Sequence, residues 1–165
     1  DQSSIWLVVW GEGTVHGIIP KGSNAGLQVR DLGEATAENI DGSNGRAQIY
    51  RTHYRWDAGL SVRDWRYVVR IPNIDKSTTL ATAATGAVLS DLMFSAMEQI
   101  PSLNAGRPVF YMSRLMRTRL RQQAAAKVAN STLTIEQVGG VPLMSFHGIP
   151  VRRVDALAAD EAAVS

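Results

Sequence analysis

The residues that could carry out acid–base, nucleophilic or metal chemistry are few and far apart. The chain has 165 residues, no cysteine and three histidines, His16, His53 and His147. The lack of cysteine excludes disulfides, thiolate nucleophiles and iron–sulfur ligation. No two histidines lie closer than 37 positions, and no serine occupies a Gly-X-Ser-X-Gly elbow. We therefore predict no catalytic, metal-binding or cofactor-binding residues, and no enzymatic activity.

Two glycine motifs resemble nucleotide-binding sequences but lack essential positions. Gly11–Gly13 has no third glycine at the start of a helix, so a tight turn between strands is the favoured interpretation. In Lys21–Ser23 the lysine precedes the glycine, which reverses the order of a phosphate-binding loop. We therefore expect no small-molecule substrate.

The basic residues are almost all arginines, 14 of 17. Since a guanidinium forms rigid bidentate pairs and stacks on aromatic rings, this bias is typical of subunit interfaces. A GC-rich genome also favours arginine, so both interpretations stay open. The net charge of +2 is too small to indicate nucleic-acid binding by itself. No run of 18 apolar residues that could span a membrane occurs.

In the stretch 47–71, aromatic and charged side chains alternate with a period of two. Tyr50, Tyr54 and Trp56 fall on one phase, as expected of extended strands that break near 57–59. A carboxylate among arginines stays ionised, which suits a salt bridge better than acid catalysis. Stacking of nucleic-acid bases on the interleaved aromatic and arginine side chains is an open alternative. The candidate subunit-contact or salt-bridge residues are Arg51, Arg55, Asp57, Arg63, Asp64 and Arg66.

A second basic feature lies in the helix that we expect from Arg114 to about Lys127, with Ser113 as its cap. Arg114, Arg117 and Arg121 share one face of this helix at i, i+3 and i+7. Such a stripe could contact phosphates, so a nucleic-acid-binding module that uses 114–121 is the alternative function. A solvated or subunit-facing surface is the favoured interpretation.

The order of predicted elements indicates an α+β protein that divides near Asp75. Residues 1–75 are predicted as a β-rich lobe, and 76–165 as a lobe with two helices, a small sheet and a frayed acidic tail. Ser3–Trp10 and Thr14–Ile19 are expected to form a hairpin. The expected helices are 77–100, interrupted at Gly86, and 114–127; the further strands are 27–37, 108–112, 132–137, 141–146 and 149–154.

Three stretches of the chain resemble a known family. They are IWLVVWGEGTVHGIIPKGSNAGL, HYRWDAGLSVRDWRYVVRIPNID and LMSFHGIPVRRVDAL. With the helix and strand order between them, they resemble the C-terminal half of a major capsid protein of tailed bacteriophages and prophages. The family's N-terminal arm, extended loop and spine helix are expected outside these residues.

This resemblance implies a structural subunit that self-assembles into hexamers and pentamers of an icosahedral shell around double-stranded DNA. It implies the tailed-phage major capsid fold, with 1–75 as the peripheral lobe and 76–165 as the axial lobe. The implied partners are further copies of the chain, in capsomere rings and the shell, and packaged DNA contacted non-specifically, with no membrane and no cofactor. The implied location is the virion, and the host bacterial cytoplasm during assembly.

Overall fold

The computed structural model describes residues 2–22, 25–38, 42, 45–76, 88–126, 133–138, 141–157 and 161–164. The chain forms two compact units. Unit 1 comprises Asp1–His16 and Val62–Ser165, and unit 2 comprises Gly17–Ser61. The units therefore divide the chain at two points, and not at Asp75 as the sequence suggested. The reason is that the segment before Asp75 pairs with the N-terminal strand of unit 1.

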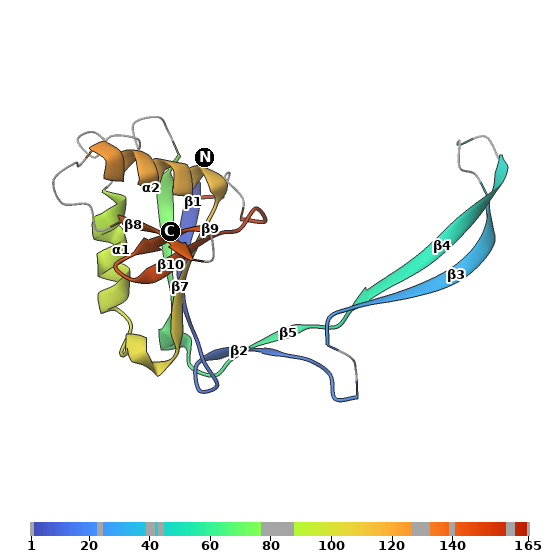
Figure 1. Ribbon diagram of the computed structural model, residues 1–165, viewed down its shortest axis with the longest axis horizontal. Coiled ribbons are helices and arrows are strands. Elements are labelled where there is room, and N and C mark those ends of the chain that lie inside the picture. The colour runs from blue at the N-terminus through green and yellow to red at the C-terminus, as the bar shows by residue number, and fades with distance from the viewer. Residues whose placement is uncertain are drawn as a thin grey trace. The chain divides into compact units, whose positions relative to one another are not determined.

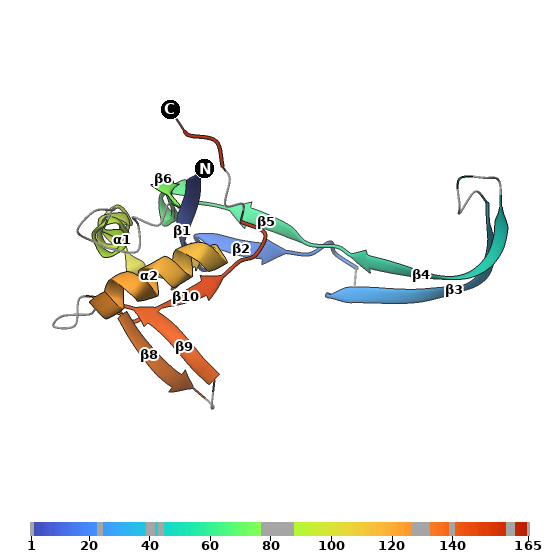
Figure 2. The same cartoon turned by 90° about the horizontal axis from the view of Figure 1, so that it is seen from above.

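Unit 1 is built on a mixed sheet centred on its first strand (Figure 1). β1 is antiparallel to both β6 and β7; β7 is parallel to β10, and β8, β9 and β10 follow as antiparallel neighbours. The strands are β1 (Gln2–Trp10), β6 (Val68–Asp75), β7 (Arg107–Met112), β8 (Leu133–Val138), β9 (Val141–Phe146) and β10 (Ile149–Arg153). Figure 2 shows β8 and β9 side by side as a hairpin whose chain continues into β10.

The alternation of β1 sets the inner face of this sheet. Ile5, Leu7 and Val9 are fully buried, while Trp6 and Trp10 on the opposite face are partly exposed. Period-two alternation of this kind places one set of side chains in the core. On the other face, the Trp10 indole donates a hydrogen bond of 2.9 Å to the Tyr111 hydroxyl.

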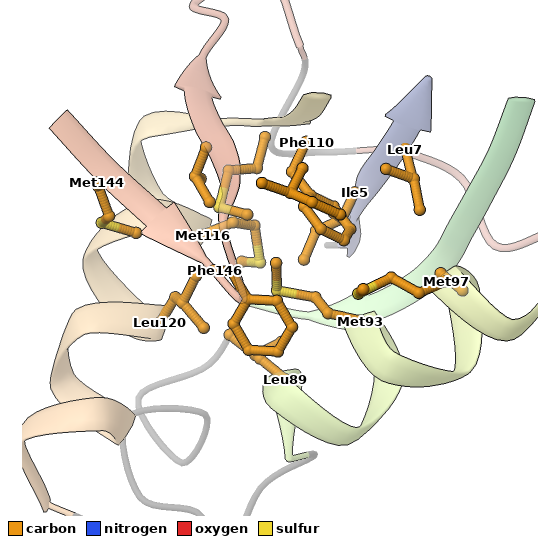
Figure 3. Close-up of a cluster of buried hydrophobic side chains, with 14 of the residues drawn as sticks. Ile5, Leu7, Leu89, Met93, Met97, Phe110, Met116, Leu120, Met144 and Phe146 are labelled. Atoms are coloured by element: carbon orange, nitrogen blue, oxygen red, sulfur yellow. The ribbon is translucent and has the colours of Figure 1, made fainter. Parts of the chain in front are cut away.

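Two helices, α1 (Leu89–Glu98) and α2 (Arg114–Ala126), contribute to the core on the inner face. Figure 3 shows Leu89, Met93 and Met97 of α1 meeting Met116 and Leu120 of α2 around the β-strand side chains. The five methionines of the chain all lie in this cluster. Methionine is flexible and fills irregular gaps, so it suits a core between two helices and a twisted sheet. The predicted helix 77–86 lies outside the described residues.

The ends of these elements follow local rules that the sequence contains. Ser113 caps α2, because its hydroxyl accepts a hydrogen bond of 3.4 Å from the Met116 amide. His147 and Gly148 both have positive φ angles, of 49° and 80°, and join β9 to β10 as a two-residue turn. Short 3-10 turns lie at Trp65–Tyr67 (η1) and Leu103–Ala105 (η3).

The predicted hairpin of Ser3–Trp10 and Thr14–Ile19 is wrong. β2 (Val15–Ile18) meets β1 at a single parallel bridge, between Trp10 and Val15, and its strand partner is β5 (Gly59–Val62). The turn at 11–14 is held instead by the Thr14 hydroxyl, which donates a hydrogen bond of 2.7 Å to the Val9 carbonyl. The boundaries between the two units fall within β2 and β5.

Unit 2 contains a long two-stranded antiparallel sheet, which we call the ribbon. It consists of β3 (Leu27–Glu38) and β4 (Arg46–Trp56), side by side in both views (Figures 1 and 2). Leu27 pairs with Trp56 at the open end, and Glu38 pairs with Arg46 at the turn end. A β-bulge interrupts the register between Asp31 and Glu34.

The expectation of a frayed tail is wrong for residues 161–164. The Glu161 amide donates a hydrogen bond of 2.9 Å to the Gln2 carbonyl, which adds a bridge at the start of β1. The Asn73 side chain both donates to the Val164 carbonyl and accepts from the Val164 amide, each at 2.8 Å. Backbone hydrogen bonding, which composition does not reveal, therefore fastens this segment to unit 1.

Candidate subunit-contact surfaces

The register of the ribbon separates its side chains into two faces of different chemistry. Directly opposed residues of an antiparallel pair point to the same side, and successive residues alternate. One face therefore carries the pairs Leu27–Trp56, Val29–Tyr54, Asp31–Thr52, Glu34–Tyr50, Thr36–Gln48 and Glu38–Arg46. We call it the acidic face, because it holds Asp31, Glu34 and Glu38.

The opposite face, which we call the basic face, carries three of the four arginines of the two strands. Its paired residues are Gln28–Arg55, Arg30–His53, Ala35–Ile49 and Ala37–Ala47, with Arg51 on the same side by alternation. The aromatic and basic side chains that alternate along β4 therefore lie on opposite faces of the ribbon. What the sequence did not reveal is the contribution of β3, whose pattern is shifted by the bulge.

Large apolar side chains of the acidic face are open to solvent. Tyr50 is 81% exposed, Trp56 71% and Tyr54 64%, and Leu27 and Val29 are also exposed. Contiguous exposed apolar surface on a protein marks an interaction site or an aggregation hazard. Each such side chain would contribute about 1.5–3 kcal/mol if it were fully buried in a contact.

Two of the six candidate salt-bridge residues pair within unit 2. The Arg55 guanidinium lies 2.9 Å from the Asp57 carboxylate, just beyond the end of β4. Arg51 is exposed, and the described residues place no carboxylate within ion-pair distance of it. This arginine is therefore a cation available to a partner.

Two further candidates pair within unit 1. The Arg66 guanidinium forms an ion pair with the Asp64 carboxylate, with the nearest atoms 2.7 Å apart. The Arg66 backbone amide also donates a hydrogen bond of 3.0 Å to the same carboxylate. The side-chain hydrogen bond from Arg66 lowers the pKa of Asp64, and the same contact raises the pKa of Arg66. Asp64 thus caps η1, while Arg63 is exposed with no described carboxylate partner. Arg55–Asp57 and Asp64–Arg66 are both local pairs, two residues apart along the chain.

The basic stripe predicted on α2 consists of Arg114, Arg117 and Arg121 and lies next to the side of the helix that packs into the core. Arg114 and Arg121 are exposed and Arg117 is half-buried, whereas Met116 and Leu120 enter the core. Asp155 partly neutralises the stripe, because its carboxylate lies 3.4 Å from Arg114; it also lies 3.3 Å from Arg153. A compensating charge therefore lies at the N-terminal end of this predicted stripe.

A polar cluster that the sequence analysis missed joins the tail to β1 and β6. The Glu161 carboxylate accepts hydrogen bonds from the Ser4 hydroxyl and from the Arg70 guanidinium, the latter at 2.9 Å. These hydrogen bonds, with Ser4 as the larger cause, lower the pKa of Glu161. Arg70 also lies over the Trp6 ring, 5.4 Å from its centroid. The cluster joins three segments that are far apart in sequence, so no local motif could have indicated it.

The histidines do not converge on a reactive centre within either unit. His147 makes an edge contact with Phe94, His16 is half-buried in β2, and His53 is exposed on the basic face. Across the described residues, no group of three potential ligands is placed to hold a metal ion. None of the helices in the described part is both long and apolar enough to cross a membrane.

An α+β fold with an exposed two-faced ribbon is typical of proteins that contact other macromolecules. The chain belongs to the family Major capsid protein GP7, whose model matches residues 1–165. It is also similar to a chain in the near-atomic-resolution cryo-EM structure of bacteriophage Epsilon15, at 38% sequence identity and a TM-score of 0.60. That match covers 98% of this chain and 48% of the phage chain, so this chain spans about half the length of its relative. No curated protein matches.

Proposed function

We propose that this chain is part of a structural subunit that self-assembles into hexamers and pentamers of an icosahedral phage or prophage capsid around double-stranded DNA. The observation that carries the proposal is the exposed apolar surface of the ribbon in a chain of the GP7 major capsid protein family. The subunit acts by binding copies of itself and not by catalysis. Its location is the virion, after assembly in the bacterial cytoplasm.

The ribbon supports this proposal because a two-stranded sheet is marginal on its own. An isolated hairpin in water is barely stable, and further strands or a packed face are usually needed. Among the described strands, β3 and β4 pair only with each other, and the large side chains of the ribbon stay exposed. Contact with another subunit would bury them, and head-to-tail contacts that close produce rings.

The direct test is the assembly state of the full-length protein. We expect negative-stain electron microscopy to show shells or capsomere rings, and sedimentation velocity to show species far larger than a monomer. The control is Leu7→Ala, which weakens the core of unit 1 and should lower the yield of folded protein before assembly. A folded protein that stays monomeric at every concentration and salt would contradict the proposal.

The second candidate function is nucleic-acid binding by the stripe Arg114, Arg117 and Arg121. The observation that favours it is that Arg121 is exposed and has no described carboxylate partner. Phosphate binding releases counterions, so affinity should fall steeply with salt. If Arg121 contacts a phosphate, Arg121→Gln should reduce the salt slope by about one. Unchanged slopes for Arg121→Gln and for Arg117→Gln would remove this candidate.

A further inference from the structure

Along each face of the ribbon, apolar and charged side chains occupy different halves. The charged half lies toward the turn end on the acidic face and toward the open end on the basic face. On the acidic face, apolar side chains occupy the open half, and the carboxylates lie from the middle to the turn end, where Glu38 pairs with Arg46 of the same face at 3.0 Å. On the basic face, cationic side chains occupy the open half and small apolar ones the turn half. The cationic group is Arg30, Arg51, His53 and Arg55, and the apolar group is Ala35, Ala37, Ala47 and Ile49.

The β-bulge creates this arrangement. Between Asp31 and Glu34, β3 uses one residue more than β4, and Gly33 at φ 70° with its amide bonded to the Asp31 carboxylate forms the kink. Without the extra residue, Glu34 and Glu38 would point to the basic face, because a one-residue shift reverses the side. The bulge therefore gathers all three carboxylates of β3 on one face.

We propose that the acidic face of one ribbon stacks on the basic face of a ribbon from a second copy of the chain, with the two ribbons running antiparallel. In this orientation the apolar open half meets the apolar turn half, and the carboxylates meet the arginines. Stacked sheets lie about 10 Å apart, so side chains of both faces interdigitate. This inference rests on the proposed function, and it names the partner surface for the ribbon.

The register of the stack follows from aligning the two apolar halves. When Val29 and Tyr54 of one copy lie over Ala35 and Ile49 of the other, large side chains pack on small ones. The same alignment places Glu34 at the level of Arg30.

The alignment also brings the other acidic and basic side chains together. Asp31 comes to the level of Arg51, and Tyr50, paired with Glu34, comes to the level of His53. Arg51, whose side chain lacks a described carboxylate partner within the chain, thereby gains one from the second copy.

Other orientations leave mismatched surfaces. Two acidic faces stacked in parallel oppose carboxylate to carboxylate, and stacked antiparallel they place carboxylates on apolar side chains. If the acidic face stacks in parallel on the basic face, arginines lie over aromatic rings, which is favourable. The carboxylates then lie over alanines, without a counter-charge from the second copy. Only the antiparallel acidic-on-basic stack pairs both the charges and the apolar surfaces.

The orientation can be tested by cross-linking, because the chain has no cysteine of its own. Full-length Val29→Cys and Ala35→Cys proteins, one carrying a size tag, are mixed, assembled and treated with a bismaleimide of about 10 Å span. We expect a cross-linked heterodimer on a denaturing gel. The matched control is a mixture of Val29→Cys with His53→Cys, which a parallel stack would cross-link and an antiparallel stack would not.

The charge pairing can be tested by reversal. Glu34→Arg opposes Arg30 of the next copy, and Arg30→Glu opposes Glu34, so each single change should raise the critical concentration for assembly by about tenfold or more. The double variant restores opposite charges and the wild-type net charge, and should recover most of the loss. Among the described residues, neither Glu34 nor Arg30 forms an ion pair within its own chain, so a rescue by the double variant would report on contacts between copies.

The outcomes separate this proposal from the proposed function. Shells without the Val29–Ala35 heterodimer, or a double variant as defective as the single ones, would overturn the stack and leave the capsid function intact. A heterodimer only in the Val29–His53 mixture would overturn the antiparallel orientation. A wild-type protein that never assembles would overturn both.

Discussion

The Glu161 carboxylate connects the tail to β1 and β6 of unit 1. Ser4 and Arg70 hold its carboxylate, so the pKa of Glu161 lies below the ordinary glutamate value of about 4.3. A lowered pKa stabilises the folded state above the ordinary value, and the contribution disappears as the pH falls through the lowered one. The tail therefore should be fastened most strongly near neutral pH.

We expect Glu161→Gln to unfold at lower urea concentration than the wild type at pH 7, and the difference to shrink as the pH falls below about 4. Urea unfolding at pH 7, 4 and 3, followed by circular dichroism, measures this. Asp155→Asn is the control, because both ion pairs of Asp155 are exposed and such pairs contribute little. A difference that does not depend on pH would show that the carboxylate charge plays no part.

Gly106 is required by a close approach of two backbone segments. A Cβ atom at this position would lie 2.2 Å from the Trp10 carbonyl oxygen, which is backbone and cannot rotate away. We expect Gly106→Ala to lower the free energy of unfolding by about 1–3 kcal/mol. Gly13→Ala is the control, since a Cβ atom there would meet nothing within 4 Å, and it should change stability by less than about 0.5 kcal/mol. Chemical denaturation measures both, and equal effects of the two changes would contradict the steric argument.

At the scale of elements, the two helices are joined by a buried polar contact. The Gln123 side chain of α2 accepts a hydrogen bond of 3.0 Å from the Leu89 amide, at the first turn of α1. Amides in the first turn of a helix have no partner within it, so an acceptor from another element satisfies one of them. Val88, the residue before the helix, makes no side-chain capping bond.

We expect Gln123→Met to lower the free energy of unfolding by about 1–3 kcal/mol, because it preserves the volume and leaves a buried amide without its acceptor. Hydrogen exchange should show faster exchange of the Leu89 amide. The control is Gln122→Met, one residue earlier on the exposed side of α2. If the Leu89 amide exchanges at the same rate in both variants, the contact does not cap α1.

The elements themselves could largely be predicted from the sequence, because their signals are local. The helix predicted at 114–127 is α2, with Ser113 at its cap, and the strands predicted at 108–112, 141–146 and 149–154 are β7, β9 and β10 to within a residue. Hydrophobic periodicity, capping residues and turn residues act over a few positions.

What the sequence did not predict depends on pairing between distant segments. The antiparallel partners of β1 are β6 and β7, which lie far along the chain, so the assumed hairpin was wrong. The bulge at Gly33 determines which face Glu34 occupies, and a loose alternation in β3 gave no sign of it. The tail contact of Glu161 joins three segments that are distant along the chain.

At the scale of the whole molecule, stability and assembly should depend on different side chains. Leu7 is fully buried in unit 1, whereas Trp56 on the acidic face is 71% exposed. Removing a buried leucine costs about 2–5 kcal/mol, and substitutions at exposed positions usually change stability by less than about 0.5 kcal/mol. The two residues therefore separate folding from the contacts between copies.

We expect Trp56→Ser to leave thermal unfolding of the unassembled protein unchanged and to raise the concentration needed for shells or rings. Leu7→Ala should lower the unfolding temperature, with assembly lost in proportion to the folded fraction. Differential scanning fluorimetry and light scattering on the same samples measure both properties. The Trp56 ring is exposed apolar surface that a contact between copies would bury, so an assembly defect without a stability defect is the expected signature. Trp56→Ser shells that form at the wild-type concentration would show that the acidic face of the ribbon is not a contact surface.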